Sequence, residues 1–193
     1  WTNTFIIGTW TLTNTDVFYA NSGTISITTG TINSGDFTLN GSTFAPSGAA
    51  TLIHTGLTVQ SGTYAKGVAT LTVGPNNFTM AGGGLSSVSG TVSMAAVNIS
   101  AVGSYIDFGS EAWTVTGFWT NATTTASWDA GTGTMLFNSA TGGTMTFAGA
   151  NLAEAEFNTV TFTSSAATAQ TFTMATRGLR WGGTLTITDT SGG

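Results

Sequence analysis

The sequence contains no cysteine and very little charge. Of its 193 residues, three are Lys or Arg, eight are Asp or Glu and one is His, which gives a formal net charge of −5. Without cysteine, disulfides and thiolate metal sites are excluded. Three cations cannot neutralise a phosphate track, so the composition excludes nucleic acid as a partner. A basic patch for binding membrane surfaces is excluded for the same reason.

Long apolar runs and helical patterns are also missing. No run approaches the roughly 18 apolar residues that a membrane helix requires, so we expect no transmembrane segment. No charged segment followed by an apolar segment opens the chain, as a signal peptide would. Apolar residues never recur with the 3.6-residue period of an amphipathic helix over more than about two turns.

The chain is instead rich in short alternations of Thr or Ser with an apolar residue. Such alternation is typical of β-strands that bury one face. Most of these runs are flanked by Gly, Asn or Asp, which tolerate tight turns. The clearest runs are Thr24–Ile27, Thr70–Val73, Thr91–Met94, Thr114–Thr116, Thr144–Phe147 and Thr184–Ile187.

The spacing of these runs indicates a repeat. Their first residues are separated by 46, 21, 23, 30 and 40 residues, and the two longest gaps contain further strand-like runs. A degenerate repeat of about 20 to 30 residues with short strands and no helix is typical of a solenoid. We therefore predict an all-β parallel β-solenoid over residues 1–193, either a processed chain or a segment of a larger protein. An antiparallel β-sandwich is the alternative, although Asn40-Gly41 is the only hairpin-type dipeptide.

A family resemblance supports the solenoid. The runs Phe157–Phe162, Thr171–Met174 and Gly182–Thr188 resemble the repeats of autotransporter-associated and filamentous-haemagglutinin-like surface proteins of prokaryotes. Similar phrasing recurs at Ser22–Ile27 and Ser89–Met94. This resemblance implies a right-handed parallel β-helix, an extracellular or cell-surface location, and an adhesive or structural role.

The acidic residues give little sign of catalysis. Glycosidases need two carboxylates facing one sugar bond, and only Glu154 with Glu156, and Asp107 with Glu111, are spaced to meet. We interpret both pairs as solvated loop carboxylates, and Lys66 as a loop charge. His54, the single histidine, is expected to be a polar wall residue, since no nucleophile motif accompanies it. We expect no metal, no cofactor and no enzymatic activity.

The remaining candidate contacts are basic and aromatic. Arg177 and Arg180, followed by Trp181, can clamp a carboxylate of Glu154 or Glu156, or an acidic sugar. Trp119 and Trp128 either stack on a sugar or a neighbouring subunit, or fill the coil interior. Glycosylation sequons occur at Asn40, Asn77, Asn98 and Asn121.

These observations favour a non-enzymatic structural protein of an extracellular filament, sheath or adhesin. Its partners would be copies of itself or flanking repeats of the same chain, with surface glycans as a further class. The alternative is a β-helix that binds or cleaves carbohydrate, as viral tail spikes do. A third possibility is ice binding, because Thr-x-Thr ladders can order water.

Overall fold

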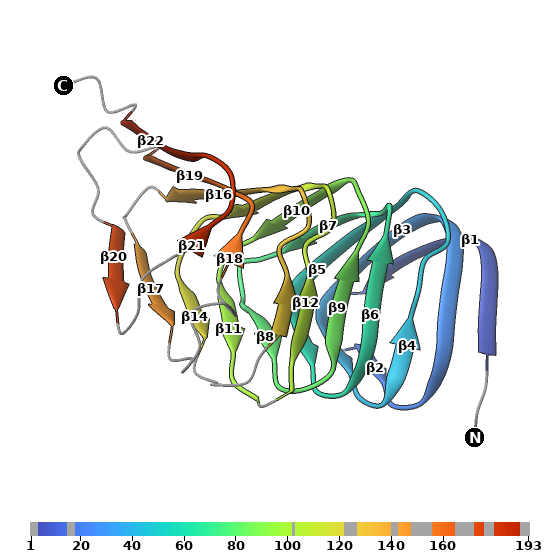
Figure 1. Cartoon of the computed structure of the whole chain (residues 1–193). Helices are drawn as coiled ribbons and strands as arrows, with labels where there is room; N and C mark the ends of the chain where they lie inside the picture. The colour runs from blue at the N-terminus through green and yellow to red at the C-terminus, as the bar shows by residue number, and fades with distance from the viewer. Residues whose placement is uncertain are drawn as a thin grey trace.

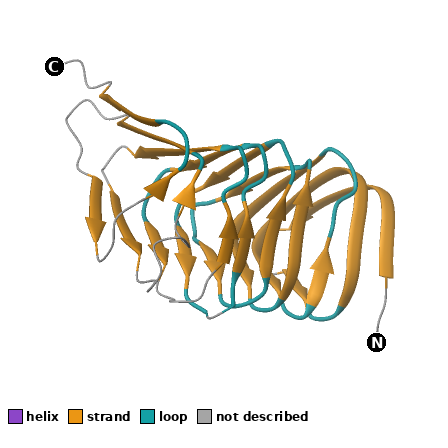
Figure 2. Cartoon of the chain, viewed as in Figure 1, coloured by secondary structure: helices purple, strands orange, loops and turns teal. Residues whose placement is uncertain are grey.

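A computed structural model of the chain describes residues 4–14, 18–101, 103–121, 127–139, 143–147, 156–164, 172–175 and 180–189. Some of these, including 4–12 and 143–147, are described by their backbone alone. The regular structure in the described residues is entirely β-strand, as Figure 2 shows. The prediction of an all-β fold is therefore confirmed.

The strands are long near the N-terminus and short thereafter. The first seven are β1 (Thr4–Asn14), β2 (Phe18–Ala20), β3 (Gly23–Leu39), β4 (Ser42–Phe44), β5 (Ala50–Val59), β6 (Gly62–Gly67) and β7 (Thr70–Val73). The next eight are β8 (Phe78–Met80), β9 (Gly84–Ser87), β10 (Thr91–Met94), β11 (Val97–Ile99), β12 (Tyr105–Asp107), β13 (Ala112–Val115), β14 (Trp119–Asn121) and β15 (Ser127–Asp129). The last are β16 (Thr134–Ser139), β17 (Gly143–Phe147), β18 (Glu156–Phe157), β19 (Thr159–Ser164), β20 (Phe172–Ala175), β21 (Arg180–Trp181) and β22 (Leu185–Asp189).

The chain winds as a parallel β-solenoid (Figure 1). Each strand pairs in parallel with the equivalent strand one coil earlier or later, as Thr31 pairs with Thr51, 20 residues on. The advance grows along the chain and reaches 25 residues between Val160 and Leu185. The predicted repeat of 20 to 30 residues is confirmed. The antiparallel sandwich is wrong, because Gly/Ser/Thr corners bend the chain into the next coil instead of reversing it.

The pairings define three stacks of strands, which we call faces A, B and C in the order in which the chain visits them. Face A contains 9–14 of β1, 29–34 of β3, 50–54 of β5, and β7, β10, β13, β16, β19 and β22. Face B contains β2, 36–39 of β3, 56–59 of β5, and β8, β11, β14, β17 and β20. Face C contains 4–7 of β1, 23–27 of β3, and β4, β6, β9, β12 and β15.

The core lies inside the coil, because alternate residues of each short strand point inward. One inward column of face A, which we call the leucine column, holds an apolar residue in every coil where it is described. It runs through Leu12, Ile32, Leu52, Leu71, Val92, Trp113, Met135, Val160 and Leu185. Its members from Ile32 to Val160 are at most 2% exposed. Burial of each such side chain contributes about 1.5–3 kcal/mol to stability.

The sequence spacing gave the correct period but mixed the faces. Thr70, Thr91 and Thr114 all lie on face A, whereas Thr24 lies on face C and Thr144 on face B. The same Thr-apolar alternation occurs on every face, since every face buries alternate residues. The separations of 46 and 30 residues are therefore not whole numbers of coils.

Candidate functional site

The two ends of the solenoid carry unpaired strand edges. β1 and β22 lie at opposite ends of the coil stack (Figure 1). Among the described residues, β1 pairs only with β3, and β22 only with β19. Each of these strands therefore presents a row of backbone N–H and C=O groups that can accept another strand.

The last coil also exposes residues of the core columns. Ile187 pairs with Phe162, which in turn pairs with Phe137. Phe137 and Phe162 are 1% and 5% exposed, whereas Ile187 is 77% exposed. An apolar side chain at a core position has thus lost its cover at this end, so the β22 end of the solenoid is an exposed apolar surface.

The predicted basic cluster lies near this end. β18 and β21 form a two-stranded parallel sheet that places Glu156 opposite Arg180 and Phe157 opposite Trp181. Trp181 is 42% exposed, which leaves it free to contact another molecule. Glu154 and Arg177 lie outside the described residues. The backbone thus brings together the Glu156 and Arg180 predicted to interact.

The other candidate tryptophan belongs to the core. Trp119, on β14, is 0% exposed. Its ring centroid lies 5.6 Å from that of Phe157 and 6.4 Å from that of Phe137. An outward contact at Trp119 with a glycan or subunit is therefore not supported, because its ring fills the interior of a wide coil. Trp128 lies on β15, and its side chain is outside the described part of the chain.

The nearby hollow is too small for a sugar. It is lined by Phe108, Trp113, Met135, Phe157 and Asn158, among others, and its volume is about 10 Å³. That is room for about one water molecule. A groove for carbohydrate has no counterpart in this hollow.

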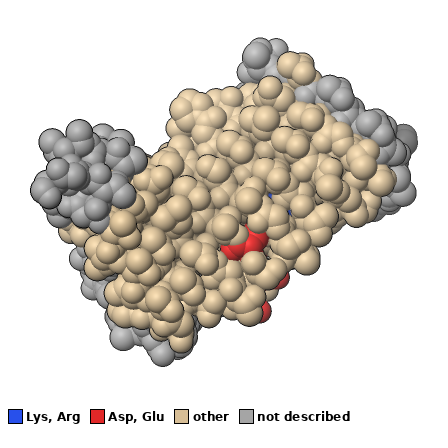
Figure 3. Space-filling model, turned by 90° about the horizontal axis from the view of Figure 1, so that it is seen from above, with Lys and Arg blue, Asp and Glu red and all other residues tan. Residues whose placement is uncertain are grey.

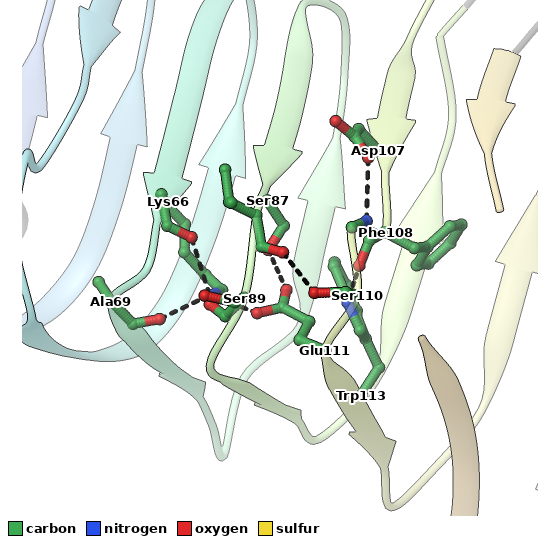
Figure 4. A network of polar contacts seen from close by, with 12 residues as sticks. Lys66, Ala69, Ser87, Ser89, Asp107, Phe108, Ser110, Glu111 and Trp113 are labelled. Carbon is green, nitrogen blue, oxygen red and sulfur yellow. Dashed lines mark hydrogen bonds and ion pairs between the residues drawn. The ribbon is translucent and has the colours of Figure 1, made fainter. Parts of the chain in front are cut away.

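A buried ion pair links three successive coils (Figure 4). Lys66 Nζ lies 2.5 Å from Glu111 Oε2, and both side chains are 0% exposed. Lys66 also donates hydrogen bonds to the carbonyls of Ala69, at 2.6 Å, and Ser89, at 2.8 Å. The hydroxyl of Ser87, on the intervening coil, donates to Glu111 Oε1. All the partners are held at one corner of the solenoid.

The predictions for these two charges were wrong. Lys66 is not a loop charge, and Glu111 is not a solvated carboxylate. Burial lowers the pKa of Lys66 and raises the pKa of Glu111, and in each case the partner opposes the shift. The available sequence signal was their separation of 45 residues, about two coils, which brings two of the few charges to one corner.

His54 belongs to a second buried polar cluster. Its Nδ1 lies 2.7 Å from Ser34 Oγ, and its Nε2 lies 2.7 Å from the hydroxyl of Tyr64. Ser34 donates its own hydrogen to the Gly35 carbonyl. A neutral imidazole satisfies this chain by donating from Nδ1 and accepting from Tyr64 at Nε2. Burial lowers the pKa of His54 to about 3, so the ring is uncharged at neutral pH.

The exposed acids serve turns. Asp107 and Asp129 pair across neighbouring coils of face C. Each accepts a hydrogen bond from the backbone N–H two residues later, of Gly109 and of Gly131. This confirms the expectation that isolated Asp residues satisfy local donors. No group of three potential metal ligands occurs in the part of the chain that the structure describes.

The sequons differ in accessibility. Asn40 and Asn77 are exposed and Asn98 is half-buried, so glycosylation there stays a prediction. Asn121 occupies a core column between Ile99 and Phe147 and is 3% exposed. A glycan cannot be placed on a side chain enclosed in this way, and the sequon at Asn121 is therefore not supported as a modification site.

The surface is almost free of charge. In Figure 3 the described surface is nearly all uncharged, with one small acidic group and a few basic atoms beside it. Among the described residues, no helix is long and apolar enough to cross a membrane. No family model, curated protein or solved structure matches the chain.

Proposed function

We propose that this chain is a non-enzymatic structural protein that assembles end to end into an extracellular filament, sheath or adhesin. The observation that supports the proposal is the state of the coil ends. Both terminal strands have a free edge, and Ile187 stands 77% exposed at a core position. A solenoid end of this kind is stabilised when another coil covers it.

The composition of the outer surface agrees with this role. The surface-strand residues are mainly Thr, Ser and Asn, and the few charges of the network at Lys66 are buried. A neutral hydroxyl surface hydrogen-bonds to water, glycans or neighbouring filaments without charge repulsion. Its resemblance to autotransporter-associated and filamentous-haemagglutinin-like repeats supports placement at the cell surface.

Electron microscopy of the purified chain at near-neutral pH tests this proposal. We expect uniform filaments with an axial repeat. Ile187→Asp, which places a charge on the exposed apolar end, is expected to abolish them, whereas Thr79→Asp, on the outside of face B, is expected to leave them intact. Single short rods of the parent chain at high concentration would rule out end-to-end assembly.

A second candidate, ice binding, is favoured by the hydroxyl rows of face A. In one outward row Thr31 stacks on Thr51 and Thr51 on Thr70. In the next row Thr72, Ser93 and Thr114 stack in register. Rows about 6.6 Å apart, with residues about 4.8 Å apart along each row, form a two-dimensional grid of hydroxyl groups on which water can order.

Thermal hysteresis of the solution tests this second function. Thr72→Lys combined with Thr114→Lys interrupts the grid, and Thr58→Lys combined with Thr79→Lys is the matched change on face B. We expect the first pair of changes to abolish any hysteresis and the second to preserve it. A parent chain without hysteresis, or equal loss from both variants, would dismiss ice binding.

A further inference from the structure

We propose that copies of the chain join through β22 of one copy and β1 of the next, in the register that continues the leucine column. This inference rests on the proposed end-to-end assembly and specifies its joint. Leu185 of one copy would pair with Leu12 of the next, and Thr186 with Thr13. We call this arrangement the coil-continuing joint.

The joint repeats a contact that the chain already makes in every coil. Leu185 covers Val160, and Leu12 pairs with Ile32, whose side chain is fully buried. At both ends the column position is flanked by threonines, as Thr184-Leu185-Thr186 and Thr11-Leu12-Thr13. Stacking one segment on the other therefore places like on like, with the leucines in the core column and the threonines in the outer rows.

The free backbone groups also match. β22 and β1 both lie on face A and run in the same direction along the coil, so their free edges can pair in parallel. β1 has 11 residues and β22 has five, so every residue of β22 can find a partner. Face B continues too, because β20 is its last strand and β2 its first.

The contact is between different surfaces of the two copies. One copy contributes its β22 end and the next its β1 end, and these ends lie on opposite sides of the molecule (Figure 1). A contact of this heterologous kind does not close on itself, so it generates an open filament with a polar axis. The leucine column would run unbroken from copy to copy.

Only one competing parallel register keeps the faces intact. A slip of one residue turns every inward side chain outward and is excluded by the burial pattern. A slip of two residues preserves the alternation and pairs Ile187 with Leu12. It displaces the coil by about 6.6 Å along the strand, which takes the corners of successive coils out of line.

Cysteine crosslinking distinguishes the two registers, and the parent chain has no cysteine of its own. Thr13 and Thr186 are both exposed, and partners in neighbouring strands lie about 4.8 Å apart, within the Cα range of a disulfide. The test variant is Thr13→Cys/Thr186→Cys. The matched control, Thr13→Cys/Thr188→Cys, forms its disulfide only after the two-residue slip. Circular dichroism checks that both variants fold.

Filaments of the test variant, after mild oxidation, should run as a ladder of covalent multimers on a denaturing gel and collapse to monomer on reduction. The control should give at least about tenfold less ladder. A ladder from the control instead would overturn the register. Filaments with no ladder from either variant would overturn the joint while leaving the proposed function standing. If the parent chain forms no filaments, both proposals fall.

Discussion

Acidification should destabilise this protein through a single histidine. His54 is the only histidine of the chain, is 0% exposed and has a pKa of about 3 in the fold, compared with about 6.5 when unfolded. Between these values the unfolded chain holds one more proton than the folded chain. The contribution of His54 to stability is therefore fully present above pH 6.5 and is lost as the pH falls through this window.

The size of the effect follows from the two pKa values. Between pH 7 and pH 4, the cost of keeping the ring of His54 unprotonated reaches about 3 kcal/mol, at about 1.4 kcal/mol for each pH unit below the unfolded pKa. Glu111 titrates with the opposite sign. Burial raises its pKa, so its protonation favours the folded state in acid, and that stability is lost as the pH rises.

Urea unfolding at pH 7 and pH 4 measures the loss, and His54→Gln isolates it. The variant lacks the ionisable ring, so its stability should fall by about 3 kcal/mol less than that of the parent over this range. Contributions of Glu111 and the other carboxylates cancel in the comparison. The histidine proton resonances provide a second measurement, and they should not titrate above about pH 4. A resonance that titrates near pH 6.5, or equal pH dependence in both proteins, would refute the reasoning.

Two further changes test the packing of the corners. Glu111→Ala leaves the buried ammonium of Lys66 unpaired and should lower the free energy of unfolding by about 3–5 kcal/mol, whereas Lys66→Met/Glu111→Leu should recover most of that loss. If urea unfolding finds the single and double variants equally unstable, the pair is not the cause. Gly131, with φ of +55°, meets the Gly109 carbonyl, so Gly131→Ala should cost at least about 1 kcal/mol in thermal unfolding. Gly84→Ala has ordinary contacts and should be close to neutral; equal losses at both positions would contradict this account.

The sequence predicted the period and the class of the fold, because alternation and spacing depend on neighbouring residues. Thr70–Val73 and Thr91–Met94 are strands of one face, as their 21-residue separation indicated. The sequence did not assign runs to faces, since Thr24 and Thr144 look like Thr70 although they lie on other faces. That assignment depends on the number of residues in each corner, which varies from coil to coil.

The candidate sites were less predictable. Lys66 and Glu111 resemble loop charges locally, and only the stacking of coils, about 45 residues apart in sequence, reveals that they neutralise each other. Trp119 has the composition expected of a sugar platform, yet the widening of the coil near Phe137 and Phe157 creates interior space that a large ring fills. The exposed end at Ile187 was foreseeable in part, because the strand-like run at residues 184–188 lacks a polar cap.

The coil-to-coil pairing also determines how the protein responds to tension. The hydrogen bonds between coils lie along the solenoid axis, and the two termini are at opposite ends of that axis (Figure 1). A pull along the axis therefore loads the bonds of one coil at a time, as in opening a zipper, instead of shearing many together. A coil of 20 residues, such as that from Thr31 to Thr51, rises about 4.8 Å when folded and extends to about 70 Å when peeled away. An array of such coils would lengthen roughly fifteenfold under load, in small steps, before its covalent chain bears the force.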